Sequence, residues 1–174
     1  SELWLVNEIT MRNVALVLDA KGSNATCTLS TLVDSTAQIN LAGQLTYRGA
    51  LYHVDIAELK VGFGTFLYEN SDPMSLALGM DGFQLKSLSM RHEAEELTMS
   101  GYFNPAGVSD LDISLKGFLL NNLQMMVKTT QLPEAFKEMG GIVSGRLLVR
   151  GTFEHPNISF DAVADGVRTG ETVF

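Results

Sequence analysis

The residues that could perform acid–base or metal chemistry are few and scattered along the chain. His53, His92 and His155 lie far apart, and none has a second histidine at the His-x-x-x-His spacing. Each is therefore interpreted as a surface or hydrogen-bonded histidine rather than a metal ligand. The single Cys27 has no second thiol for a disulfide or a redox motif. Because free cysteine is among the most buried residue types, we expect Cys27 to be a small buried apolar residue.

Short motifs of enzyme active sites are also missing from the sequence. Gly62-Phe63-Gly64 lacks the third glycine and the following helix of a nucleotide-binding loop. There is no Gly-x-Ser-x-Gly elbow and no phosphate-binding Gly-Lys-Ser/Thr. Glu93, Glu95 and Glu96 cluster beside Arg91, which favours a solvated turn over paired catalytic carboxylates. The sequence predicts a protein that is not an enzyme and that has no cofactor or metal.

Composition limits the remaining function classes. The 174 residues suffice for one domain with a core of its own, and the net charge of −8 with only 12 Lys and Arg argues against binding nucleic acid. The densest apolar run, Val14–Leu18, is far shorter than the roughly 20 residues that cross a bilayer. The start at Ser1-Glu2-Leu3-Trp4 shows neither an initiator Met nor a signal peptide. We expect an internal fragment of a larger protein.

The strongest pattern in the chain is the alternation of apolar and polar residues, which places all apolar side chains of a strand on one face. The alternation slips by one residue between Ile56 and Leu59 and then resumes. We predict that one apolar face is lined by Leu16, Leu18, Leu29, Ile39, Leu41, Val54, Ile56, Leu76, Leu78, Met80, Leu111, Ile113, Leu115 and Val149.

Turn residues separate these alternating runs. They are Lys21-Gly22-Ser23-Asn24, Arg48-Gly49, Glu69-Asn70-Ser71-Asp72-Pro73, Asp81-Gly82 and Asn104-Pro105-Ala106-Gly107. Many short strands with one polar and one apolar face are typical of antiparallel pairing. The predicted fold is therefore mainly β, a single β-repeat domain over residues 1–174.

One segment has helical rather than strand periodicity. Between Phe118 and Met139, apolar residues such as Leu119, Leu123 and Met126 recur every three or four positions. Pro133 is suited to start a second short helical turn. We expect a helical insertion over residues 118–139 that caps or plugs the core.

The chain also contains an internal repeat. Leu45–Leu51, Leu97–Phe103 and Leu147–Phe153 share the frame Leu-x-apolar-x-Gly-x-apolar, and their glycines Gly49, Gly101 and Gly151 are 52 and 50 residues apart (101 − 49 and 151 − 101). Such a period indicates a unit of about 50 residues whose neighbours stack to extend one apolar surface. We expect this array to continue beyond both ends of the chain.

The C-terminal stretch from Gly141 to Ile158, with Gly141-x-x-x-Gly145 followed by Gly151-Thr152-x-x-x-Pro156, resembles the AsmA-like superfamily and in particular its TamB-like translocation and assembly proteins. The order of Leu97–Phe103, Leu111–Leu115 and the helical stretch upstream is also similar to that family. The resemblance covers residues 61–174 well, whereas the first 60 residues match only as a compatible β-pattern.

This resemblance implies a strongly curved sheet, a β-taco or trough with an apolar interior, in a periplasmic part of a protein anchored in the inner membrane of a Gram-negative bacterium. It further implies a role in moving phospholipid or unfolded outer-membrane proteins toward the outer membrane, together with an outer-membrane barrel protein. The family implies no catalytic residues.

Physical chemistry alone leaves two possibilities open. A sheet with one apolar face must cover it with another layer or with a ligand that supplies hydrocarbon. The first possibility is an open trough that shelters acyl chains or an unfolded β-strand client, which could also add to the sheet edge. The second is a closed β-sandwich or β-solenoid scaffold or adhesin with a sealed core. Exposed edges would also allow the fragment to associate edge to edge with itself.

Overall fold

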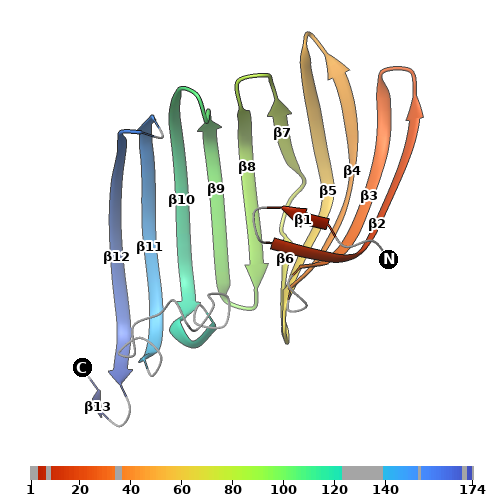
Figure 1. Ribbon diagram of the computed structural model, residues 1–174. Helices are drawn as coiled ribbons and strands as arrows, with labels where there is room; N and C mark the ends of the chain where they lie inside the picture. Colours follow the sequence, from red (N-terminus) through yellow and green to blue (C-terminus); the bar gives the residue numbers. More distant parts are fainter. Residues whose placement is uncertain are drawn as a thin grey trace.

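The computed structural model is a single antiparallel β-sheet (Figure 1). It describes residues 4–6, 9–33, 37–122, 139–152, 154–169 and 172–173. All thirteen strands of these segments belong to the same sheet, and every strand pair in it is antiparallel. The predicted mainly β, antiparallel fold is confirmed.

The sheet follows the order of the chain almost throughout. Its strands are β1 (Trp4–Val6), β2 (Ile9–Lys21), β3 (Asn24–Val33), β4 (Ala37–Arg48), β5 (Leu51–Phe63), β6 (Phe66–Asn70), β7 (Met74–Leu78), β8 (Phe83–His92), β9 (Glu95–Phe103), β10 (Val108–Leu119), β11 (Met139–Thr152), β12 (Pro156–Thr169) and β13 (Thr172–Val173). Neighbours along the chain are neighbours in the sheet, except that β6 and β7 both pair with β5 on one side and β8 on the other.

Four of the five predicted turn segments connect adjacent strands as hairpins. These hairpins lie at residues 21–24, 48–51, 79–82 and 104–107, and the β11–β12 connection lies at the same end of the sheet, the top of Figure 1. We call this end the tip rim. The opposite end, where β3, β5, β8 and β10 finish, is the far rim.

The fifth predicted turn, at residues 69–73, instead splits one strand position into β6 and β7. Pro73 has no N–H to donate to a ladder, so pairing is interrupted there. The Asn70 side chain bridges the gap, because its oxygen accepts from the Leu59 N–H at 2.7 Å and its amide donates to the carbonyl oxygens of Ala57 and Asp72 at 3.2 and 3.0 Å.

Bulges bend several strands. The slip in apolar alternation between Ile56 and Leu59 corresponds to a bulge, where Gly43 pairs with Ile56 and Ala42 with Glu58. Other register shifts occur in β2 beyond Arg12, in β8 between Leu85 and Leu88, and at the end of β10. An extra residue on one strand increases the local bend and twist, so the bulges curve the sheet.

Curvature brings side chains together across several strands. Tyr68 on β6 and Phe118 on β10 are separated in the sheet by β8 and β9, which in a flat sheet would put their backbones roughly 14 Å apart. Their rings nevertheless stack with centroids 6.0 Å apart. Side chains lean together only on the inside of a bend, so the face that carries them is concave.

The predicted helical insertion is correct only in part. Phe118 and Leu119 are the last residues of β10, and Met139 is the first of β11, so the helix cannot span 118–139. Residues 120–122 are helical, and residues 123–138, which include Leu123, Met126 and Pro133, lie outside the described residues.

The three repeat copies occupy comparable places. Leu45–Arg48 of β4, Leu97–Phe103 of β9 and Leu147–Thr152 of β11 all run toward the tip rim, and the glycine of each copy lies at or near the end of that strand. The number of strands between copies differs, because β5 to β8 separate the first pair and only β10 separates the second among the described strands.

Candidate functional site

The register places the predicted lining residues on one face of the sheet. Cross-strand partners connect this face continuously, for example Leu16 to Leu29, Leu29 to Leu41 and Leu41 to Leu59 on the N-terminal side. In the second half, Met99 pairs with Ile113 and Ile113 with Leu147. We call this surface the apolar face. It contains every predicted lining residue except Met80.

Met80 was predicted wrongly. Strand β7 ends at Leu78, and Met80 lies in the turn closed by the hydrogen bond from the Gly79 N–H to the Gly82 carbonyl oxygen at 2.9 Å. Its side chain is fully exposed. Met80 matches the alternation of Leu76 and Leu78 only by chance, because the strand has already ended before the turn that contains Gly79 and Gly82.

Burial on the apolar face is uneven. Two clusters of buried side chains, Ile56 with Met74 and Leu85, and Tyr68 with Met90 and Phe118, lie over the middle strands. Leu16 and Leu18 on β2, and Ile158 and Phe160 on β12, remain more than half exposed. The remaining predicted lining residues apart from Ile56 and Met80 are half-buried. The apolar face is therefore packed at its centre and open toward both sheet edges.

A buried carboxylate lies at the far rim, where sequence analysis predicted a solvated turn. Glu95 is 3% exposed, and its side chain accepts hydrogen bonds from the Tyr68 hydroxyl, the Leu119 N–H at 2.8 Å and the Asn122 amide at 2.7 Å. Glu93 and Glu96 are not part of this network. The sequence does contain a signal for this burial. Glu95 lies two residues before Leu97 and four before Met99, so the alternation places it on the same face as these apolar residues.

The far-rim network also changes the acidity of Tyr68. Burial, together with the hydrogen bond to Glu95, raises the pKa of the Tyr68 hydroxyl above its ordinary value. The ring of Tyr68 also contacts His92, with centroids 5.2 Å apart. These contacts fix the beginning of residues 120–122 against the end of the apolar face.

The opposite face of the sheet is polar and carries the ion pairs. Lys60 lies 3.2 Å from Glu58 and 3.3 Å from Glu69. Arg91 lies 3.0 Å from Glu96, and hydrogen bonds from Arg91 and Ser89 lower the pKa of the Glu96 carboxyl. Such exposed pairs contribute little to stability, so this face acts mainly as the solvated side of the sheet.

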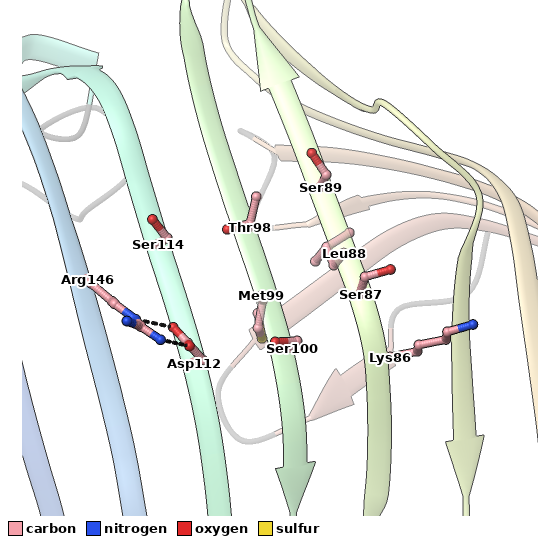
Figure 2. Close-up of a pocket in the computed structure, with 10 residues that line it drawn as sticks. All are labelled: Lys86, Ser87, Leu88, Ser89, Thr98, Met99, Ser100, Asp112, Ser114 and Arg146. Atoms are coloured by element: carbon pink, nitrogen blue, oxygen red, sulfur yellow. Dashed lines mark hydrogen bonds and ion pairs between the residues drawn. The ribbon is translucent and has the colours of Figure 1, made fainter.

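A described cavity lies on the polar face (Figure 2). It measures about 510 Å³ and is lined largely by hydroxyl side chains of β8 to β10, such as Ser89, Thr98 and Ser114. Its charged wall is neutralised because the Arg146 Nε donates to Asp112 at 2.9 Å, a hydrogen bond that lowers the pKa of the Asp112 carboxyl. The charges of Arg146 and Asp112 at that end of the cavity are therefore paired with each other.

The candidate chemical residues do not assemble into a site. His53 lies on the polar side of β5, the His92 Nδ1–H donates to the Leu67 carbonyl oxygen at the far rim, and His155 lies in the exposed β11–β12 turn. Cys27 is half-buried rather than buried and lies on the apolar face between Leu18 and Gly43. Within the described ranges, no three His, Cys, Asp or Glu side chains form a cluster suited to a metal ion.

A search of the described residues finds no helix that could span a membrane. Comparison with known proteins finds no match to a family model, to a curated protein sequence or to a solved structure.

Proposed function

We propose that this chain is a periplasmic segment of a TamB-like protein, and that its concave apolar face shelters phospholipid acyl chains during transport toward the outer membrane. The observation that supports the proposal most is an apolar face that runs unbroken through one sheet and is still exposed at both edges. The resemblance of residues 61–174 to the TamB-like family points in the same direction.

Single-layer architecture is the first argument. Every pair of strands in extensive contact among the described residues is a pair of hydrogen-bonded neighbours. A second sheet packed on the apolar face, as in the sandwich alternative, is not found in this part of the chain. The hydrocarbon that covers the exposed apolar residues must therefore come from another molecule or from another part of the protein.

Energetics make an acyl chain a suitable occupant. Burial of one methylene group contributes about 0.8 kcal/mol, so a chain of about 16 carbons gains roughly 12 kcal/mol before entropic costs. The described apolar face carries few groups that would bind one position strongly. Thr31, the polar residue in its N-terminal half, uses its hydroxyl to donate to the Arg12 carbonyl oxygen at 3.2 Å. A lipid chain could therefore slide along the face.

Leu18→Asp tests the proposal, with Val17→Asp as its matched control. The two residues are neighbours on β2, point to opposite faces and have similar exposure, 58% and 63%. Because both side chains are solvent-exposed, each variant should keep its thermal stability within about 0.5 kcal/mol. We expect Leu18→Asp to reduce severalfold the transfer of fluorescent phospholipid from vesicles to the chain, since it puts a charge in the lipid path.

Val17→Asp should leave the transfer unchanged, because its carboxylate lies on the polar face. Equal transfer by both variants and the unmodified chain would contradict an acyl-chain site on the apolar face. Loss of transfer in both variants would show that any added charge near this edge of the sheet reduces binding, whichever face carries it.

Open sheet edges favour a second candidate occupant, an unfolded outer-membrane protein strand. Among the described residues, β1 pairs only with Ile9–Met11 of β2, and β13 pairs only with Arg168 and Thr169 of β12. The remaining residues of β2 and of β12 therefore have backbone groups that are unpaired on the outer side of the strand and available for strand addition. The same edges would support edge-to-edge self-association. An outer-membrane barrel protein would be a partner of the full-length protein.

A further inference from the structure

The two rims of the apolar face differ in how far they are closed. At the far rim, Tyr68 and Phe118 are 4% and 2% exposed, and the Glu95 network lies over the end of the sheet. At the tip rim, Tyr47 and Tyr52 are 52% and 49% exposed. The molecule thus buries Tyr68 and Phe118 at one end of its strands and leaves Tyr47 and Tyr52 about half exposed at the other end.

The same asymmetry extends along the strands. All exposed large apolar side chains of the described apolar face lie in the half nearer the tip rim; they are Leu16, Leu18, Tyr47, Tyr52, Ile158 and Phe160. In the other half, the apolar side chains Val33, Val61 and Phe63 are at least half-buried. The apolar face is therefore open toward the tip rim and closed toward the far rim.

Amphipathic aromatic residues form the edge of this opening. A cross-strand row runs from Tyr47 to Tyr52, Leu78, Phe83 and Phe103. The rings of Tyr47 and Tyr52 are in contact, with centroids 4.9 Å apart. Neither tyrosine hydroxyl has a hydrogen-bond partner among the described residues. Tyrosine is favoured where one end of the ring is apolar and the other is in contact with water or headgroups.

Two cations end strands at the same rim, on the polar side of the sheet, because Lys21 shares the side of Val17 and Arg48 alternates with Tyr47. Lys21 ends β2 and Arg48 ends β4, both are exposed, and neither has an ion-pair partner within the described ranges. Carboxylates near this rim are Asp19, two residues before Lys21, and Asp81 and Glu154, which lie in the later hairpins. The N-terminal half of the tip rim therefore carries free tyrosine hydroxyls on its apolar side and two cations at the strand ends on its polar side.

We infer that a bound phospholipid has a fixed orientation, with its phosphate headgroup at the tip rim beside Tyr47, Tyr52 and Arg48 and its acyl chains running along the strands toward the far rim. This inference rests on the proposed function and adds the polarity of the site. A phosphate accepts hydrogen bonds from tyrosine hydroxyls and attracts the two cations. The far rim also has exposed cations on its polar side, such as Lys116, but its described apolar face offers no free tyrosine hydroxyl, because that of Tyr68 donates to the buried Glu95 carboxylate.

Strand dimensions predict where the chain ends. An acyl chain spans about half of a bilayer's hydrocarbon core, roughly 15 Å, which corresponds to about five residues of a strand. Measured from Tyr47 along β4, this distance reaches Ala42 and Gly43, and the cross-strand partner of Gly43 is Ile56. The methyl end should therefore lie near Ile56, halfway along the apolar face.

Fluorescence quenching by spin-labelled lipid tests the orientation. The single Trp4 is replaced by Phe, and one tryptophan is introduced either at the tip rim, Tyr47→Trp, or at the far rim, Phe63→Trp. Each chain is loaded with phosphatidylcholine that carries a nitroxide on its headgroup or near its chain end. We expect the headgroup label to quench Tyr47→Trp at least twofold more than Phe63→Trp, and the chain-end label to quench the two variants about equally.

Stronger or equal quenching of Phe63→Trp by the headgroup label would overturn the orientation, while quenching by the chain-end label would still support lipid binding. If neither label quenched either variant, the result would contradict the proposed function itself, because no lipid would be bound. Thermal unfolding of each variant checks that the sheet is intact.

A charge variant provides an independent measurement. Lys21→Ala combined with Arg48→Ala should weaken binding of phosphatidylglycerol severalfold but leave binding of uncharged dodecyl maltoside unchanged. Lys116→Ala, which removes an exposed cation at the far rim, is the matched control and should affect neither ligand. Equal weakening by Lys116→Ala would contradict a headgroup site at the tip rim.

Discussion

At the scale of single residues, Glu95 and Tyr68 are the polar groups that the apolar face buries at its far rim. Their burial is acceptable because every described contact of the carboxylate is a hydrogen bond: the Tyr68 hydroxyl, the Leu119 N–H and the Asn122 amide all donate to it. The alternation placed Glu95 on the apolar face, but a sequence cannot reveal which donors will satisfy a carboxylate. These donors come from β6, from the end of β10 and from residues 120–122, which are 24 to 27 residues away.

Tyr68→Phe tests the role of this network through alkaline pH. The pKa of Tyr68 is raised in the folded state, so above about pH 10 the unfolded chain releases the phenolic proton while the folded chain retains it. Stability from this group is therefore complete below pH 10 and is lost as the pH rises further, by up to about 1.4 kcal/mol per pH unit.

In urea unfolding between pH 8 and pH 11, we expect Tyr68→Phe to be about 1–2 kcal/mol less stable at pH 8, because it loses the hydrogen bond to Glu95. The difference from the unmodified chain should shrink as the pH approaches 11. Parallel stability curves for the two proteins would contradict a raised pKa at Tyr68.

At the scale of elements, the strands and most turns follow directly from local sequence. The alternation of apolar and polar residues predicts which face of the sheet each side chain occupies. Hairpins are marked by Gly22, Gly49 and Gly82, and the slip in the alternation before Leu59 marks a bulge. Longer-range pairing decides the rest. The segment at 69–73 has turn chemistry, yet it became a break between β6 and β7 because β5 and β8 both pair across it.

The repeated glycines have a structural reason that can be tested at Gly101. Its φ is +126°, and a Cβ atom there would overlap the carbonyl oxygen of Asp110 on the neighbouring strand. Gly101→Ala should cost about 1–3 kcal/mol for the backbone conformation alone, with the overlap adding to it.

Gly22→Ala is the matched control, because its φ is +65° and open space surrounds the added methyl group. It should cost only about 1–2 kcal/mol, as expected for a left-handed residue in a turn. Thermal unfolding measures both variants. A smaller loss for Gly101→Ala than for Gly22→Ala would contradict the close approach of β9 and β10.

At the scale of the whole molecule, the balance between packing and exposure distinguishes this sheet from a closed core. Buried clusters at β5 to β10 hold the bend, whereas Leu18 and Phe160 remain exposed at the two edges. The sequence predicted the apolar face almost completely, since the period of two depends only on local geometry. It could not predict that the far rim is closed and the tip rim open, because this depends on contacts between strands far apart in the chain.

The most direct test of the central claim is photo-crosslinking in cells from Ile113, with the neighbouring Ser114 as control. Ile113 lies on the apolar face between Met99 and Leu147, and Ser114 faces the polar side of the same strand. A photoreactive amino acid at Ile113 should capture phospholipid, identified by mass spectrometry, and the same group at Ser114 should not. Capture of polypeptide at Ile113 would instead favour the strand client. Capture of neither at Ile113, in a chain that remains folded, would contradict an apolar face that serves as an open binding surface.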